Sequence, residues 1–346
     1  MPIEITLLAS ILEPAVVAAV QAISEKLNPP ITETSSGSKL QNLDRRLSLG
    51  LSKEENKLVA ALLVEKEGSA AQETAKDLEK QHQGSVVVKV TGKAYSSKPS
   101  ERIEQEPLDK LVPGASLGHY RGFPGSLGGF VTYKARTKRS LGLISASHVL
   151  AMNNTAKKGE AVLHPGSPDG PRVLDNKIGT LVNYTYLVHY QDEDEDTDPL
   201  NTEDIALIKP DDPERLPSAN MVPNPNDPDA KIKLKGSIPA EQLFERVGEQ
   251  VYKQGRTTGF TVGTLDVASV MNYSIQLPDG RLYVYKDLAV VKNVAGKRFS
   301  LPGDSGSIVY TTDGKAIGLV VGGSPEYTFI SPISACLKAM KAELLV

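Results

Sequence analysis

The sequence is poor in cysteine and in large aromatic side chains. Its 346 residues include one cysteine, Cys336, six phenylalanines and no tryptophan. A single cysteine excludes an intramolecular disulfide and a metal site built from several thiolates. Neither sign of charge dominates, because 39 lysines and arginines are balanced by 42 aspartates and glutamates, for a net charge of −3. This balance argues against a nucleic-acid-binding protein.

Long apolar runs and a secretory signal are also lacking. The first residues have no basic segment of the kind that begins a signal peptide, and Glu13 and Pro14 interrupt the only apolar stretch there. That stretch is too short for a membrane span. Together with the lack of disulfides, these features predict a cytoplasmic protein that binds neither membrane nor nucleic acid. We expect no cofactor and no metal.

Glycine and proline are plentiful, with 29 and 23 residues, which indicates many turns and short strands. Over residues 118–346, short apolar runs alternate with turn signals, and the Asp-Gly pairs at 279–280 and 313–314 are typical of hairpin loops. The pattern predicts a mainly antiparallel β domain, a sandwich or a barrel. Residues 85–117 are expected to form a strand at Val86–Val90 and then a polar connector.

The first 84 residues have a different pattern. Apolar positions recur at helical spacing over 14–27, and residues 52–55 and 69–72 resemble helix-capping boxes. We therefore expect a helical N-terminal module over 1–84, with a flexible linker at 32–38.

Three short motifs carry side chains suited to acyl transfer. His148 follows an apolar strand, Asp204 opens another, and Ser305 lies in the glycine-bracketed turn 303–306. Acyl transfer needs a hydroxyl nucleophile, a base that takes its proton, and an acid that holds the base in one tautomer. Each motif alone has an ordinary structural explanation. Their conjunction in one β domain is far more specific and predicts a Ser-His-Asp triad.

These motifs resemble those of the chymotrypsin-like (trypsin-fold) serine peptidases. The segment 251–265 is similar to a strand-turn-strand of the bacterial branch that includes α-lytic protease and streptogrisin. Tyr252 and Val262 stand where that branch has a disulfide, and Val149 stands where a cysteine usually follows the histidine. The resemblance covers roughly residues 118–335. It implies a mainly β fold, a double antiparallel β-barrel of chymotrypsin type, preceded here by the small helical module.

The resemblance also implies a role for each matching residue. Ser305 would be the nucleophile, His148 the general base and then the general acid, and Asp204 the carboxylate that orients the imidazole. The backbone N–H groups of Gly303 and Ser305 would form the oxyanion hole. The strand expected to pair with an extended substrate consists of Val321, Gly322 and Gly323.

Three features depart from the family pattern. Phe299 stands six residues before Ser305, where trypsin has an acidic specificity residue, so we expect a small or apolar P1 residue rather than a basic one. Ser307 stands where glycine is commoner. No Ile-Val-Gly-Gly start is present to supply a new N-terminus for Asp304. In the bacterial branch an internal arginine takes that role, and the sequence does not identify the residue that does so here.

Two other groups of residues could be read as metal ligands. The segment 191–198, QDEDEDTD, is rich in carboxylates, but it lacks the glycine and the ligand spacing of a calcium-binding loop. A solvated charged loop is the favoured interpretation. His119, His164 and His189 have no metal-ligand spacing, and we interpret them as structural or surface residues.

The main prediction is an intracellular serine endopeptidase that acts on protein or peptide substrates and is regulated by its N-terminal module or by a partner. The alternatives are a catalytically silent trypsin-like binding domain and an esterase with the same triad. Three roles stay open for residues 1–84. They are a packing extension of the barrels, an adaptor that binds a protein partner, and an inhibitory pro-segment removed by self-cleavage.

Overall fold

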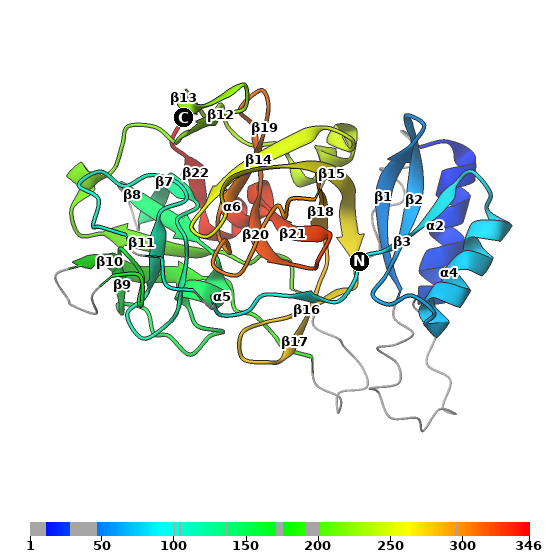
Figure 1. Cartoon of the computed structure of the whole chain (residues 1–346), viewed down its shortest axis with the longest axis horizontal. Coiled ribbons are helices and arrows are strands. Elements are labelled where there is room, and N and C mark those ends of the chain that lie inside the picture. The colour runs from blue at the N-terminus through cyan, green and yellow to red at the C-terminus, as the bar shows by residue number, and fades with distance from the viewer. Residues whose placement is uncertain are drawn as a thin grey trace.

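The computed structural model describes residues 12–27, 47–99, 101–103, 105–135, 138–170, 176–190, 201–294 and 296–346. The linker predicted at 32–38 and the acidic segment 191–198 lie outside the described residues. Figure 1 shows three parts side by side, which are a first barrel, a second barrel in the middle, and an N-terminal module. Within the described residues, no helix is both long enough and apolar enough to cross a membrane.

The first barrel is an antiparallel sheet in the order β22-β7-β8-β11-β10-β9-β5-β6. Alternate side chains of its strands, such as Phe130, Leu143 and Ile208, fill the interior. The helix α5 (Ser147–Leu150) follows β8 directly. The strands are β5 (Ser116–His119), β6 (Pro124–Ser126), β7 (Gly129–Ala135), β8 (Lys138–Ser145), β9 (Ala161–Leu163), β10 (Lys177–Tyr184), β11 (Ala206–Pro210) and β22 (Ala342–Leu344).

The second barrel is closed. β14 pairs with β15, β15 with β18, β18 with β21, β21 with β20, β20 with β19, and β19 again with β14. These strands are β14 (Gln250–Gly255), β15 (Gly259–Met271), β18 (Leu288–Asn293), β19 (Ile308–Thr311), β20 (Ala316–Gly323) and β21 (Tyr327–Pro332). The predicted double antiparallel β-barrel of chymotrypsin type is therefore confirmed.

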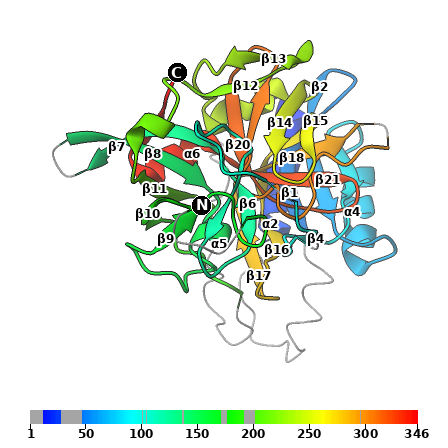
Figure 2. The same ribbon diagram turned by 60° about the vertical axis from the view of Figure 1, so that its left-hand side comes forward.

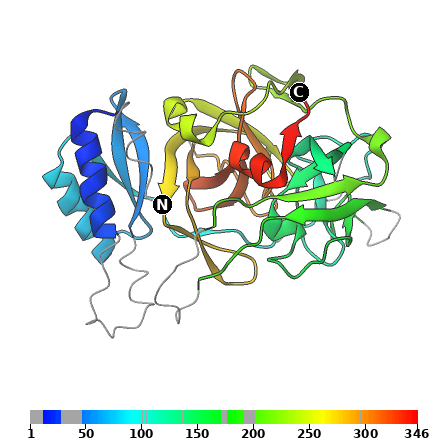
Figure 3. The same ribbon diagram turned by 180° about the vertical axis from the view of Figure 1, so that it is seen from behind.

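Smaller elements complete the barrels. The predicted turns at 279–280 and 313–314 are confirmed, because they join β16 to β17 and β19 to β20. The helix α6 (Ile333–Met340) packs its apolar face against side chains of both barrels and is seen in front in Figure 3. The remaining elements are β12 (Met221–Asn224), β13 (Asp227–Lys233), β16 (Tyr273–Gln276), β17 (Leu282–Tyr285) and the 3₁₀ helices η2 (Pro213–Arg215) and η3 (Ala240–Arg246).

The N-terminal module extends the sheet of the second barrel. β1 pairs with the outer half of the long strand β15, β2 pairs antiparallel with β1, and β3 pairs parallel with β2. Two helices cover the face of this sheet that points away from the barrels (Figure 1). The elements are α2 (Pro14–Leu27), β1 (Ser48–Glu54), β2 (Lys57–Val64), α4 (Ala70–Gln81) and β3 (Val86–Val90).

The interpretation of this module as purely helical is wrong for its middle part. Helices do form at 14–27 and after residue 69, but the segment interpreted as a capping box and helix is the hairpin of β1 and β2. Glu55 and Asn56 form its turn, both with positive φ angles, 48° and 65°. The strand at Val86–Val90 is confirmed, and it pairs with β2 instead of beginning a connector.

The physical reason for the error is that β2 is buried on both faces. Ala60, Leu62 and Val64 belong to the core shared with α2 and α4, whereas Ala61 and Leu63 belong to a core shared with the second barrel. A strand buried on both sides has a continuous apolar run, which periodicity alone cannot distinguish from a buried helix.

Candidate active site

His148 and Asp204 come from neighbouring strands of the first barrel. His148 lies in α5, just after β8, and Asp204 lies just before β11, which pairs with β8. His148 Nδ1 is 2.5 Å from Asp204 Oδ2, and the backbone N–H of His148 donates to Asp204 Oδ1 at 3.0 Å. A carboxylate that accepts from Nδ1–H leaves Nε2 as the proton acceptor of the ring.

Asp204 is sealed from solvent at the junction of the barrels. Its side chain and that of His148 are fully buried, and its backbone N–H donates to Ser331 Oγ of the second barrel at 3.3 Å. The nearby Tyr285 is also buried, and burial, with the charge of Asp204 as a second cause, raises the pKa of its phenol well above the ordinary value. The carboxylate therefore meets no solvent, and its two hydrogen bonds fix the orientation of the imidazole.

Ser305 comes from the second barrel, in the loop before β19. Gly303 in the same loop has φ of +100°, and a Cβ there would collide with Thr257 Oγ1, so only glycine fits. The backbone N–H groups of Gly303 and Ser305 have no hydrogen-bond acceptor among the described residues. Two free donors beside a serine hydroxyl are what a developing oxyanion requires.

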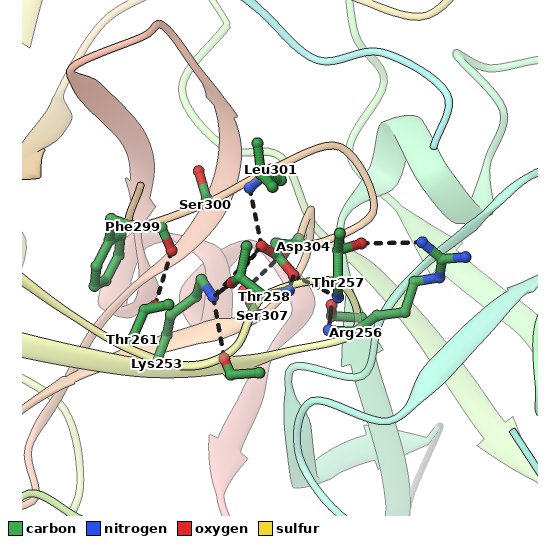
Figure 4. A network of polar contacts seen from close by, with 12 residues as sticks. Lys253, Arg256, Thr257, Thr258, Thr261, Phe299, Ser300, Leu301, Asp304 and Ser307 are labelled. Carbon is green, nitrogen blue, oxygen red and sulfur yellow. Dashed lines mark hydrogen bonds and ion pairs between the residues drawn. The ribbon is translucent and has the colours of Figure 1, made fainter. Parts of the chain in front are cut away.

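A buried carboxylate, Asp304, holds this loop in shape (Figure 4). Asp304 Oδ1 accepts the N–H groups of Thr257 and Thr258 at 2.8 and 3.2 Å. Asp304 Oδ2 accepts Thr258 Oγ1–H at 2.8 Å and the N–H of Leu301 at 2.9 Å. These bonds fix Asp304, which directly precedes Ser305, and Thr257 Oγ1 also donates to the carbonyl oxygen of Pro302, which directly precedes Gly303, at 2.8 Å.

The cation that pairs with Asp304 is Lys253. Its Nζ lies 3.4 Å from Asp304 Oδ2, and both side chains are fully buried (Figure 4). Burial lowers the pKa of Lys253, and attraction to Asp304 opposes that shift. An arginine was expected in this role from the family resemblance, but the arginine of the same segment, Arg256, makes a buried ion pair with Asp169 instead. The sequence signal that could have identified Lys253 is its position directly after Val251 and Tyr252, in the buried middle of β14.

An unexpected serine lies between the nucleophile and the base. Ser96 Oγ is 3.0 Å from His148 Nε2 and 3.0 Å from Ser305 Oγ. Ser96 belongs to the connector after β3 and directly follows β4 (Ala94–Tyr95). Ser96 was not predicted from the sequence, because it lies in a polar segment outside the region of resemblance and no local pattern marks it.

The predicted substrate-pairing strand is the end of β20 and already has a partner. Gly323 pairs antiparallel with Tyr95 of β4. A Cβ at Gly322 would lie 2.9 Å from the carbonyl oxygen of Tyr95, so the absence of a side chain permits this approach. Ser305 Oγ also donates to the carbonyl oxygen of Val321 at 3.4 Å. The structure thus brings the strand 321–323 next to Ser305.

A small pocket opens beside Ser305. Arg298 supplies the only charged side chain in its lining among the described residues, and it is exposed. Phe299 is fully buried, and its carbonyl oxygen accepts Thr261 Oγ1–H at 2.8 Å. The remaining lining residues include Ser300, Leu301, Pro302, Gly322, Gly323 and Ser324. The described lining residues include no acidic group that could attract a basic substrate side chain.

Two of the other histidines have protein partners. His119 Nε2 is 3.2 Å from Glu160 Oε2, and His164 Nδ1 is 2.6 Å from the carbonyl oxygen of Ser116. Both rings are buried, and burial lowers their pKa values. Across the described residues, no three His, Cys, Asp or Glu side chains gather as metal ligands would.

Two antiparallel barrels, with histidine and aspartate from the first and serine from the second meeting at their junction, define a chymotrypsin-type fold. No protein-family model and no curated protein matches the sequence. Among solved structures, the chain is similar to Thermobifida fusca protease A (18% identity, TM-score 0.44) and to a Nocardiopsis protease (20% identity, TM-score 0.44), in each case over 68% of this chain and 98% of the other. It is also similar to a glutamic acid-specific serine protease (18% identity, TM-score 0.46), over 68% of this chain and 100% of that one.

Proposed function

We propose that this protein is a serine endopeptidase that acts through Ser305, His148 and Asp204. The observation that carries the proposal is the placement of these three side chains at the junction of the barrels. The base donates two hydrogen bonds to a buried carboxylate, and the nucleophile lies beside two backbone N–H groups that have no acceptor among the described residues. Each group is placed for one part of acyl transfer.

The reaction follows from this geometry. His148 Nε2 takes the proton of Ser305 Oγ as the hydroxyl attacks the scissile carbonyl carbon, and Asp204 stabilises the imidazolium that forms. The N–H groups of Gly303 and Ser305 bind the oxyanion, each donor contributing about 3 kcal/mol. His148 then protonates the leaving amine. Water, activated by the same base, releases the acyl group and regenerates Ser305.

An endopeptidase is favoured over an esterase because of the strand 321–323. Hydrolysis of an ester needs only the triad and the oxyanion hole. This strand can in addition form main-chain hydrogen bonds with an extended peptide substrate. Its pairing with Tyr95 supports this capacity. We propose a small P1 side chain, and a basic one is disfavoured because Arg298 would repel it.

We also propose that the protein works in a reducing compartment. Tyr252 and Val262, which stand where relatives of the bacterial branch have a disulfide, lie directly opposite each other on β14 and β15. Tyr252 stacks on Phe260 with ring centroids 5.9 Å apart, so packing fills the position of a cross-link. Burial raises the pKa of the Cys336 thiol to about 12, which suits a structural cysteine.

Labelling by a fluorophosphonate probe tests the proposed chemistry. The full chain should be labelled on Ser305, Ser305→Ala should not be labelled, and Ser140→Ala, a half-buried serine of the first barrel, should behave as wild type. Mapping of new N-termini in a proteome treated with wild type or with Ser305→Ala then separates peptidase from esterase activity. Absence of labelling on Ser305 in the folded wild type and also in folded Ser96→Ala, which lacks the hydroxyl 3.0 Å from Ser305 Oγ, would refute the proposal.

A further inference from the structure

We propose that residues 91–99, here named the strap, are an autoinhibitory segment that occupies the substrate cleft of its own chain. The inference rests on the proposed function, since the cleft it fills is the one assigned to substrate. β4 lies within the strap, and Ser96 places its hydroxyl between the base and the nucleophile. In the intact chain, a substrate and the strap therefore compete for one site.

The backbone of the strap is held on both sides. Tyr95 pairs antiparallel with Gly323 on one edge and parallel with Gln276 of β16 on the other. The N–H of Ser96 also donates to the carbonyl oxygen of Gln276 at 2.8 Å. β4 is thus an inner strand between β16 and β20 and uses the hydrogen bonds that an extended substrate would use. In Figure 2, β4 is labelled close to β16.

The side chain of Ser96 blocks the chemistry. Its hydroxyl is within hydrogen-bond distance of both His148 Nε2 and Ser305 Oγ. While it stays there, the lone pair of Nε2 that should accept the Ser305 proton already faces another hydroxyl. The group beside Ser305 Oγ is a side-chain hydroxyl and no electrophile, so the strap inhibits in this position.

The strap crosses the whole junction between the barrels. Before Ser96 it pairs with β20 of the second barrel. After Ser96, Lys98 and Pro99 line a cavity whose other walls include Phe123 and Met152 of the first barrel. A substrate peptide bound across Ser305 would follow the same path, with one of its ends over the first barrel and the other over the second.

The N-terminal module anchors the strap. Thr91, which follows β3, donates its N–H to Val64 of β2 at 2.9 Å, and its carbonyl oxygen accepts Ser324 Oγ–H at 2.5 Å. Tyr273 Oη donates to the carbonyl oxygen of Gly92 at 2.9 Å. Displacement of the module would pull directly on β4. The module therefore acts on the site as a regulator.

The test compares labelling rates of Ser305 in the full chain and in three variants. Ser96→Ala removes the hydroxyl, Ser96→Pro removes both the hydroxyl and the N–H bonded to Gln276, and Lys93→Ala alters an exposed side chain of the strap as control. We expect labelling to be about 10-fold faster for Ser96→Ala, faster still for Ser96→Pro, and unchanged for Lys93→Ala. Equal rates in wild type and in folded Ser96→Pro would overturn the inference.

Hydrogen exchange separates this inference from the proposed function. In the Ser305→Ala chain, the amides of residues 94–96 should be protected like those of β20, because they belong to an inner strand. Exchange as fast as in an open loop would refute the strap. Protected amides together with no labelling of any variant would support occupancy of the cleft by the strap and refute the proposed peptidase function. A Ser305-dependent cut between Tyr95 and Lys98, found by intact mass, would also support occupancy of the cleft.

Discussion

Removing the charge of Lys253 should damage the active site without touching a catalytic side chain. In Lys253→Met, the fully buried Asp304 loses its only cationic partner among the described residues. Breaking a buried ion pair costs about 3–5 kcal/mol. Asp304 keeps four hydrogen bonds, from Thr257, Thr258 and Leu301, so we expect the lower end, about 3 kcal/mol.

Two assays read out this change. The free energy of unfolding from urea titration should fall by about 3 kcal/mol in Lys253→Met, whereas Lys292→Met, an exposed lysine of β18, should change it by less than about 0.5 kcal/mol. Fluorophosphonate labelling should slow by about 100-fold, because Asp304 positions both oxyanion donors. Labelling at the wild-type rate would show that Asp304 needs no cation and would refute this reasoning.

The same pair predicts an alkaline limit to activity. Burial lowers the pKa of Lys253, so the cation is lost below the usual range of lysine, about 10.4, as pH rises. Labelling should therefore slow in this range, and Lys253→Arg should move the limit upward because guanidinium stays charged.

Loss of the Lys253 proton at high pH affects stability in the opposite direction from activity. Between the lowered folded pKa and the unfolded one, the unfolded chain binds more protons at Lys253, so this residue's contribution to stability rises with pH. A slower rate in a more stable protein would distinguish loss of the ion pair from unfolding. An identical alkaline limit in wild type and Lys253→Arg would contradict the assignment.

Three further changes test other parts of the site. Asp204→Asn should lower the rate of peptide hydrolysis at neutral pH by about 10⁴-fold. The amide has a single acceptor oxygen, so if it accepts the backbone N–H of His148, its NH₂ group faces Nδ1 and favours the tautomer with the proton on Nε2. Arg298→Glu should raise cleavage after lysine relative to aspartate by about 10-fold, as a P1 peptide library would show, and an unchanged ratio would remove Arg298 from the specificity pocket. Arg256→Met should cost about 3–5 kcal/mol of unfolding free energy, since it leaves Asp169 buried and unpaired, and a loss below about 1 kcal/mol would contradict this.

Turn residues and strand alternation are local signals, and they predicted the antiparallel β domain, as a sandwich or a barrel, whereas the double barrel was implied by the family resemblance. The Asp-Gly turns and the apolar runs of the second barrel appear in the structure where the pattern placed them. The hairpin of β1 and β2 was missed because both faces of β2 are covered, and that covering is a tertiary property. A segment that is apolar at every position has no hydrophobic periodicity from which a helix could be distinguished from a strand.

The candidate site shows the same division between local and long-range information. His148, Asp204 and Ser305 could be proposed from short motifs, since each lies next to its own strand. Ser96 and Lys253 could not, because each matters only through a partner that is distant in sequence. Ser96 meets Ser305 across 209 positions, and Lys253 meets Asp304 through the closure of the barrel.

The strand β15 explains how a module outside the barrels reaches the active site. One end of β15, at Gly259, adjoins the turn whose N–H groups bind Asp304, and the other end, at Met271, pairs with Leu49 of β1. The module therefore reaches the candidate site by two routes. The strap follows β3 directly in the chain, and β15 pairs with β1 through backbone hydrogen bonds. The strap covers the triad, and β15 supports the loop that carries the oxyanion donors. Movement of the module would therefore uncover the nucleophile and shift the support of this loop at the same time.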